Sequence, residues 1–575
     1  MDRRAVPCGG RPDRTGGAVG RGPADRAVPD SATVQDAADS SAPNLADRLR
    51  RAADTQGDRP ALHWRDRTMT WSQLDAAVTA TARALAVTAP PAPGDAHPPR
   101  VAIAFGNTPD FVVTYLAVLR AGLVAVPVNP GFTARELRHV LADSGAAVLV
   151  CAQEVRDRVA ADELPALAAV HTAPPVTDGD GPAGFPVRAG DDLAVLLYTS
   201  GTEGRPKGAM LSHRALAANH EQVGRIDPPV VGPDDTVLLA LPLFHAYGLN
   251  SGLGAVVHHG ATGVLVAEPG PTGALDEIAR HRVSVLVGVP SMFLTWAEAD
   301  GAAALASVRV AVCGAAPLPP PVAARFTEAT GHPVHVGYGL TETAPVLTST
   351  LVDGEPRPGS IGRPLPGVEL RLVGADGTEL WRDGVPAAEE DGDELDLSDD
   401  ASGTDPGQIV VRGDNLFAGY WPDGRGGPDA DGWWATGDVA YADEDGDLYL
   451  VDRLGELILV NGFNVYPHEV ELVLQAHPGV AESAVLGVPH PRTGETVRAY
   501  VVRAAGSTVT GEELLGHCAR NLARFKCPTA VEFVDSLPHS AIGKVRKTEL
   551  RPAAPPVPSP APPTEIRTEV PDVQQ

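Results

Sequence analysis

The stretch RVAIAFGNTPDFVVTYLAVLRAGLVAVPVNPGFTARELRHVLADSGAAVLV (100–150) alternates short apolar runs with segments of helical periodicity. The apolar runs at 101–105, 124–128 and 146–150 have the length of buried strands, and the segments between them are long enough for helices. Strands joined by helices pair in parallel, because the helix carries the chain back across the sheet. The stretch therefore predicts a βαβαβ unit and an α/β fold.

Both predicted helices begin with a recognisable start signal. Thr108 can cap the first helix, with Pro109 at the first helical position, where no backbone N–H is needed. Thr133 and Glu136 have the spacing of a capping box at the start of the second helix. These signals predict the helix starts independently of the apolar periodicity.

The chain of 575 residues is longer than a single hydrophobic core usually supports. The βα alternation is expected to continue to about 452, after which shorter strands at 482–488, 497–502 and 530–534 surround a helix near 511–522. This pattern predicts a large N-terminal domain of parallel or mixed sheets with crossover helices, and a small α+β C-terminal domain, which the resemblance described below implies is mobile. The expected divisions are a disordered extension at 1–41, the large domain at 42–453, the small domain at 454–551 and a disordered Pro-rich tail at 552–575.

The composition limits the partners and the compartment. A formal net charge of −27 argues against nucleic acid, and part of this charge lies in an acidic run at 389–400 that is expected to be a solvated loop. The five cysteines lack the spacing of a zinc site or a disulfide framework, so reduced thiols in a cytoplasm are expected. No apolar run approaches the roughly 18 residues of a membrane span, so no transmembrane helix is expected. Peripheral membrane contact and the oligomeric state stay open.

The segment YTSGTEGRPKG (198–208) follows a buried-looking strand at 193–197 and contains small hydroxyl and glycine residues. Such a loop can wrap backbone N–H groups around phosphate oxygens. It is not a Walker A loop, because Lys207 precedes Gly208 instead of following the second glycine. The segment predicts a phosphate site of another kind.

The part of this segment at 199–208 resembles the phosphate-binding signature of the adenylate-forming superfamily of acyl-CoA synthetases, adenylation domains and luciferases. Segments similar to the family's later motifs follow in its order: LPLFHAYG (241–248), GVPSMF (288–293), CGAAPL (313–318), GYGLTET (337–343), WWATGD (433–438), DRLGELILVNGFNVYPHEVE (452–471) and LPHSAIGKVRKTEL (537–550). The resemblance covers about 45–551, nearly the whole chain.

The resemblance implies an ATP site assembled from several motifs. The matching residues are Thr199, Ser200, Gly201, Thr202 and Lys207 for the triphosphate, Gly314, Ala315, Ala316 and Tyr338 for adenine, Asp438 and Arg453 for the ribose, and Thr341 for the α-phosphate. Glu342 and Thr202 match the residues that hold Mg²⁺, a cation that prefers oxygen ligands.

The remaining matches concern the acyl group and its transfer. His245 resembles the residue beside the acyl carboxylate, and Lys544 resembles the mobile lysine that bridges this carboxylate and the α-phosphate. Gly462 matches the position where the pantetheine arm of coenzyme A passes, since a residue without Cβ leaves room there. Gly455 stands at the position of the interdomain hinge.

These roles imply a two-step reaction of a small-molecule carboxylic acid with ATP, Mg²⁺ and coenzyme A. A carboxylate resists attack by a thiol because its leaving group would be oxide, so the acid is first converted to an acyl-adenylate. The motifs at 458–471 and 540–550 look most like those of bacterial medium- or long-chain fatty-acid:CoA ligases. Transfer to a carrier protein, or a non-catalytic relative that only binds nucleotide or acyl-CoA, are the alternatives.

The identity and chain length of the acid stay open. The segment GLNSGLGAVV (248–257) contains no charged residue, which favours an apolar tail over a dicarboxylate. Glu203, Gln408 and Gly455 depart from the usual family residues, and 389–400 is an insertion. Glu203 would repel phosphate unless its side chain points outward.

Overall fold

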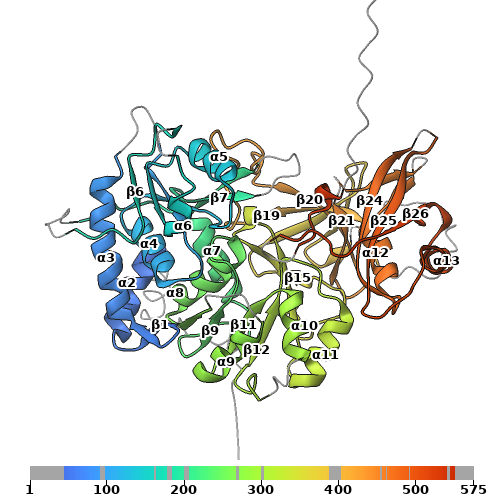
Figure 1. The fold of residues 1–575 in the computed structure, drawn as a ribbon, viewed down its shortest axis with the longest axis horizontal. Coiled ribbons are helices and arrows are strands. Elements are labelled where there is room, and N and C mark those ends of the chain that lie inside the picture. The colour runs from blue at the N-terminus through green and yellow to red at the C-terminus, as the bar shows by residue number, and fades with distance from the viewer. Residues whose placement is uncertain are drawn as a thin grey trace, which may run out of the picture. The chain divides into compact units, whose positions relative to one another are not determined.

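The computed structural model describes residues 44–90, 97–160, 163–177, 184–199, 206–266, 271–298, 303–386, 403–453, 456–460, 463–490, 492–540 and 544–550. Within these residues the strands form four sheets (Figure 1). The two predicted disordered ends and the acidic run at 389–400 lie outside the described residues.

The stretch 100–150 forms the βαβαβ unit that its sequence predicts. It belongs to a six-stranded sheet with the order β6-β5-β3-β4-β7-β8, in which the pairs are parallel except for β7 with β8. Its elements are β3 (Arg100–Ala104), α4 (Pro109–Arg120), β4 (Val124–Pro127), α5 (Ala134–Ser144), β5 (Val148–Cys151), α6 (Gln153–Arg156), β6 (Ala169–His171), β7 (Leu193–Thr199) and β8 (Lys207–Ser212).

The helix starts within this unit are confirmed. Thr108 caps α4, and Thr133 and Glu136 form both hydrogen bonds of a capping box on α5. At the other end of α5, Gly145 adopts a left-handed φ of +58°, and the amide of Ala146 donates back to the last helical turn. Ala146 therefore belongs to the helix terminus, and β5 begins later than the apolar run suggests.

A nine-stranded mixed sheet forms the second layer, with the order β15-β14-β13-β12-β11-β9-β10-β1-β2. Its centre is parallel and both edges are antiparallel. The strands are β1 (Pro60–Trp64), β2 (Arg67–Thr70), β9 (Thr236–Leu239), β10 (Thr262–Leu265), β11 (Val285–Gly288), β12 (Val310–Cys313), β13 (His335–Gly339), β14 (Val346–Ser349) and β15 (Arg363–Pro364).

Helices pack against these two sheets and enclose a common apolar core. Helix α2 packs against α3, and α10 lies beside α11 near β12 (Figure 1). The helices are α2 (Leu45–Gln56), α3 (Trp71–Thr88), α7 (His213–Val223), the π-helix η2 (Tyr247–Gly254), α8 (Ala255–His259), α9 (Pro271–His281), α10 (Pro290–Glu298), α11 (Pro320–Thr330) and the 3₁₀ turn η3 (Thr341–Thr343). None of the helices in the described ranges is long and apolar enough to cross a membrane.

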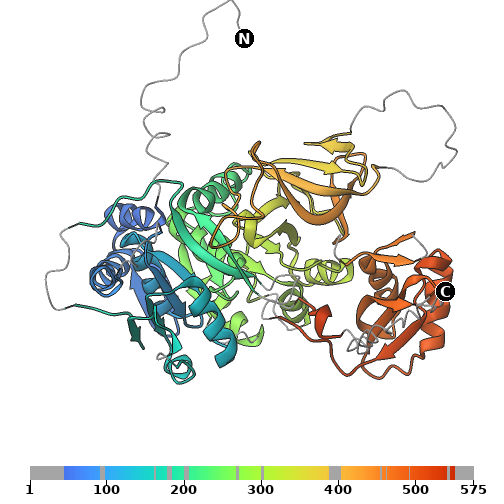
Figure 2. The same ribbon diagram turned by 90° about the horizontal axis from the view of Figure 1, so that it is seen from above.

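The prediction that βα alternation continues to about 452 is wrong for the last part of that range. The described residues between 346 and 453 form antiparallel strands, seen as a curved layer in yellow and orange in Figure 2. Connections such as 374–378 and 443–447 are tight turns, too short for the crossover helix that parallel strands require. Beyond β14 and β15, these strands form a six-stranded sheet with the order β18-β17-β16-β19-β20-β21. Its strands are β16 (Glu369–Val373), β17 (Glu379–Arg382), β18 (Val385–Pro386), β19 (Gly407–Arg412), β20 (Trp434–Ala442) and β21 (Leu448–Arg453).

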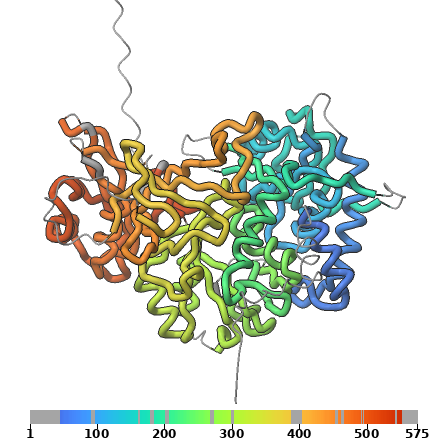
Figure 3. The backbone as a smooth tube through the Cα atoms, turned by 180° about the vertical axis from the view of Figure 1, so that it is seen from behind, coloured from blue at the N-terminus to red at the C-terminus, as the bar shows by residue number. Residues whose placement is uncertain are grey.

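The C-terminal part has a sheet and an apolar core of its own, coloured orange to red in Figure 3. Its strand order is β23-β22-β25-β24, with β26 paired to β25, which confirms the predicted small α+β unit. The elements are β22 (Ile458–Val460), β23 (Phe463–Val465), α12 (Pro467–Gln475), β24 (Val480–His490), β25 (Gly494–Arg503), α13 (Gly511–Asn521), η4 (Arg524–Lys526), β26 (Ala530–Phe533) and η5 (Lys547–Glu549). The fold is therefore mixed α/β, with large N-terminal sheets and a smaller C-terminal domain.

Candidate active site

The predicted phosphate loop connects two antiparallel strands. Thr199 at the end of β7 pairs in register with Lys207 at the start of β8, so both residues stand at the mouth of one hairpin. The hydroxyl of Tyr198 donates to Asp143 Oδ2 at 2.6 Å. Burial, and then the contact with Asp143, raise the pKa of Tyr198, so its hydroxyl remains a donor at neutral pH. Helix α5, which carries Asp143, therefore braces the stem of the hairpin.

The predicted phosphate residues inside this hairpin are Ser200, Gly201 and Thr202, and they lie outside the described residues, as does Glu203. Their roles remain predictions. The same holds for Gly455 and Gly462.

The predicted Mg²⁺ ligand Glu342 lies in η3, directly after β13. Its side chain is buried, with 7% of the residue exposed. The hydroxyl of Tyr420 donates to Glu342 Oε1 at 2.7 Å, and the amide of Phe417 donates to the Glu342 carbonyl at 2.8 Å. A carboxylate has two oxygens, and in Glu342 the Oε1 atom is held by Tyr420, so Oε2 is the oxygen that could bind a metal. The arrangement fits Mg²⁺, which uses one or two protein carboxylates together with phosphate oxygens.

Tyr420 is not among the site residues predicted from the sequence. Its sequence setting, AGYWPDGRGG (418–427), shows only a glycine-rich turn. The partner carboxylate is 78 residues away in the chain, so no local signal could have linked the two.

The predicted ribose pair meets across two antiparallel strands. Asp438 in β20 stands directly opposite Arg453 in β21, so their backbones are neighbours. Asp438 is buried, with 4% exposed, and accepts the hydroxyl of Tyr338 at 2.7 Å. The contact brings a predicted adenine residue beside a predicted ribose residue. The side chain of Arg453 lies outside the described part of the structure, so its contact with the ribose stays a prediction.

The predicted adenine wall lies where two parallel strands end. Gly314, Ala315 and Ala316 follow β12, and Tyr338 lies near the end of the neighbouring strand β13. A Cβ at Gly314 would lie 2.9 Å from the ring of Tyr247, so this close approach requires glycine. Ligands of α/β sheets bind at the carboxyl ends of strands, which is the edge that these residues occupy.

Lys544 acts electrostatically on His245, although the two residues are far apart in sequence. Burial, and secondly the positive charge of Lys544, lower the pKa of His245 to about 4. The ring is therefore uncharged at neutral pH. Its Nδ1 accepts the backbone N–H of Tyr247 at 3.3 Å, so the ring hydrogen is on Nε2. A neutral His245 can donate from Nε2 to an acyl oxygen without competing with Lys544 for a negative charge.

An apolar cavity lies between the central sheet and η2. It is lined by Leu238, Leu239, Leu241, Gly248, Gly252 and Val287. The wall contains no charged or polar side chain, and the side chains close the space so far that it has no room for a water molecule. A π-helix widens the backbone spiral and is frequent at functional sites. Two of its lining residues, Leu241 and Gly248, lie within four residues of His245 in the chain.

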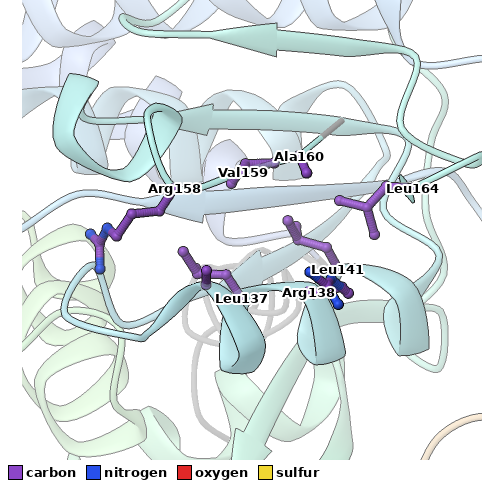
Figure 4. A pocket seen from close by; sticks show the side chains of 8 residues that line it. Leu137, Arg138, Leu141, Arg158, Val159, Ala160 and Leu164 are labelled. Atoms are coloured by element: carbon purple, nitrogen blue, oxygen red, sulfur yellow. The ribbon is translucent and has the colours of Figure 1, made fainter. Parts of the chain in front are cut away.

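A second cavity lies on α5 and is unrelated to the predicted site. Figure 4 shows Leu137, Leu141 and Leu164 turned toward one another, with Arg138 and Arg158 at its margin. Its volume is about 10 Å³, enough for about one water molecule. It is a packing void rather than a ligand site.

The fold and these contacts define an adenylate-forming enzyme. The chain belongs to the AMP-binding enzyme family: the family's sequence model matches residues 49–421, and the model of the AMP-binding enzyme C-terminal domain matches residues 469–544. It is an acid–thiol ligase of the AMP-forming type.

Individual relatives differ in the acids that their names specify. A feruloyl-CoA synthase of Amycolatopsis sp is 39% identical over 472 residues, covering 80% of this chain and 89% of the relative. A long-chain-fatty-acid–CoA ligase of Yersinia pestis is 33% identical over 553 residues, covering 88% of this chain and 94% of the relative.

Two solved structures have a similar fold. ATP-bound MatB from Rhodopseudomonas palustris has a TM-score of 0.77 and 33% identity, covering 88% of this chain and 98% of that one. The o-succinylbenzoate coenzyme A synthetase MenE from Bacillus subtilis, in complex with ATP and magnesium, has a TM-score of 0.73 and 28% identity, covering 88% and 98%.

Proposed function

We propose that this enzyme is a fatty-acid:CoA ligase, which forms acyl-AMP and pyrophosphate and then acyl-CoA and AMP. The observation that carries the proposal is the likeness of the motifs at 458–471 and 540–550 to those of fatty-acid:CoA ligases. The apolar residues beside η2 support it against a dicarboxylic acid, because they offer no partner to a second carboxylate. An unpaired charge buried there would be costly, so a dicarboxylic acid is disfavoured. An apolar tail gains free energy from leaving water.

In the first step, a carboxylate oxygen of the acid attacks the α-phosphorus of ATP, and the bond from that phosphorus to pyrophosphate breaks. His245 donates from Nε2 to the acyl carboxylate, and Lys544 lies between this carboxylate and the α-phosphate. Lys207, Thr199 and the 200–202 loop hold the triphosphate. Mg²⁺, held by Glu342 and Thr202, would neutralise phosphate charge when bound. A cation between two anions is most effective where water is excluded.

In the second step, the thiolate of coenzyme A attacks the acyl carbonyl carbon, and AMP leaves. Gly462 leaves room for the pantetheine arm, and Gly455 is the hinge between the domains at 42–453 and 454–551. Both assignments rest on the motifs in the sequence.

An aryl acid is the second candidate, and the 39% identity to a feruloyl-CoA synthase favours it. A planar aryl tail is also apolar, so the lining of the cavity does not separate the two candidates. Transfer to a carrier protein is a further alternative for the second step.

The test is acid-dependent pyrophosphate release with ATP and Mg²⁺ across saturated acids of increasing chain length, hydroxycinnamic acids and dicarboxylic acids. Coenzyme A and a phosphopantetheinylated carrier protein are then compared as acceptors. We expect the highest kcat/KM with a medium- or long-chain fatty acid and transfer to coenzyme A. A preference for a hydroxycinnamic acid would support the second candidate, and a preference for a dicarboxylic acid would contradict both.

A further inference from the structure

The segment 417–421 lies against β8, the strand that begins with Lys207. Its backbone hydrogen bonds to that strand run from Ala418 to Met210 at 2.9 Å, from Met210 to Gly419 at 3.0 Å and from Trp421 to Gly208 at 2.8 Å. Tyr420 also forms an antiparallel bridge with Ala209. The segment therefore pairs with β8 through one antiparallel bridge and three backbone hydrogen bonds.

The same segment touches the predicted metal ligand. Phe417 donates its backbone amide to Glu342, and Tyr420 donates its hydroxyl to Glu342 Oε1 at 2.7 Å. Lys207 Nζ lies 5.7 Å from the centroid of the Tyr420 ring, within the range of a cation–π contact. A single side chain thus contacts the carboxylate proposed for Mg²⁺ and the cation proposed for the triphosphate.

The backbone fixes the position of this tyrosine. Gly419 has a φ of +106°, and a Cβ there would lie 2.0 Å from the carbonyl oxygen of Gly424. Only glycine fits this turn, because any side chain would clash with backbone. The amide of Tyr420 donates to Arg425 at 3.0 Å and its carbonyl accepts from Gly424 at 2.9 Å, which closes the turn.

We propose that Tyr420 is a positioning residue for the metal–nucleotide complex. The proposal rests on the proposed function, since it takes the roles of Glu342 and Lys207 from it. The terminal torsion of a glutamate is broad, so a fixed donor on Oε1 selects one orientation and directs Oε2 toward the phosphates. The ring face restricts the long, flexible side chain of Lys207. Removing the hydroxyl frees the carboxylate, and removing the ring frees both groups.

Two variants separate these effects. Tyr420→Phe retains the ring and removes the hydroxyl that donates to Glu342, and Tyr420→Leu removes both the hydroxyl and the ring that faces Lys207. Tyr449→Phe is a matched control, because its hydroxyl also donates to a carboxylate, Asp443 Oδ2 at 3.3 Å, outside the proposed site. Glu342→Gln alone and combined with Tyr420→Phe completes a double-mutant cycle.

The measurement is metal–nucleotide binding, with Mn²⁺ and ATP in the absence of acid, followed by electron paramagnetic resonance and calorimetry. We expect Tyr420→Phe to weaken Mn²⁺ binding in the presence of ATP about tenfold and Tyr420→Leu to weaken it further, with Tyr449→Phe unchanged. In the Glu342→Gln background, Tyr420→Phe should have no further effect.

Three results would overturn the proposal: wild-type metal affinity in Tyr420→Phe, an equal loss in the control, or additive losses in the double variant. The last would show that Tyr420 acts through the fold and not through Glu342. A wild-type enzyme that releases no pyrophosphate with any acid would refute the proposed function instead. The binding measurement needs no acid, so it would still decide the role of Tyr420.

Discussion

Replacing Asp438 by Asn should weaken ATP binding while preserving the fold. Asp438 is almost fully buried, accepts the hydroxyl of Tyr338 at 2.7 Å, and stands opposite Arg453 in the β20–β21 pair. Asn has nearly the same shape and can still accept from Tyr338 through its amide oxygen. The variant therefore removes the negative charge that would accept the ribose hydroxyls and leaves the packing in place.

The size of the effect follows from the hydrogen bonds that the charge strengthens. A hydrogen bond to a charged group contributes about 1.5–3 kcal/mol, so its loss should raise the apparent KM for ATP roughly ten- to a hundredfold. Tyr338→Phe deletes one neutral donor to Asp438, and its effect should be several-fold. Because Tyr338 acts on the ribose through Asp438, the double variant should resemble Asp438→Asn alone.

The assay is pyrophosphate exchange as a function of ATP concentration at saturating acid. A companion assay, thioester formation from supplied acyl-AMP, should show a raised KM for acyl-AMP and an unchanged KM for coenzyme A, because only the ribose of acyl-AMP is assigned to Asp438. Tyr441→Phe, on the same strand as Asp438, controls for loss of a tyrosine hydroxyl. Unchanged ATP dependence in Asp438→Asn, or strictly additive losses in the double variant, would refute the reasoning.

Other variants test separate parts of the molecule. Lys544→Ala should abolish acyl-AMP formation but leave thioester formation from supplied acyl-AMP nearly intact; equal loss in both assays would remove Lys544 from the first step. Burial lowers the pKa of His213 to about 4 from an ordinary value of 6.5, so the unfolded chain binds this proton more readily, and the free energy of unfolding should fall as the pH drops from 6.5 to 4. At pH 5, burial of the His213 ring should lower the free energy of unfolding by about 2 kcal/mol relative to its value above pH 6.5. In denaturant titrations, His213→Leu should make the free energy of unfolding depend less on pH between 6.5 and 4, and an unchanged pH dependence would contradict the assignment. Lys547→Met should lower the midpoint temperature of thermal unfolding, because it removes the ion pairs with Glu456 and Glu471. Lys547→Arg keeps the positive charge, so its midpoint should stay close to that of the wild type. Equal midpoints in the two variants would show that the pairs contribute nothing to stability.

The parts of the fold that the sequence predicts correctly depend on local signals. The caps at Thr108 and Thr133 involve residues within one helical turn, and the parallel pairing of β3 with β4 and with β5 follows from the helices between the strands. The predicted alternation fails after 346, where strands are joined by short turns. Apolar runs there look like the earlier ones, and the length of the connections decides the pairing.

In the candidate site, several contacts join residues that are far apart in the chain. In the sequence, only the family resemblance connects Asp438 with Arg453. In the structure, the pairing of β20 with β21 places the two backbones opposite one another. The contacts Tyr338–Asp438 and Tyr420–Glu342 span 100 and 78 residues. Such contacts depend on how the sheets pack, and neither periodicity nor a single motif contains that information.

The ion pairs of Lys547 bear on where the small domain can turn. Its ammonium lies 3.0 Å from Glu456 and 2.8 Å from Glu471, so it joins the segment that carries Lys544 both to α12 and to the residue that follows the proposed hinge. A rotation between Glu456 and Lys547 would separate these partly buried opposite charges, which is unfavourable. A rotation at 454–455 would leave both pairs intact. The pairs therefore favour Gly455 as the pivot, and they require Lys544 to move together with Glu456.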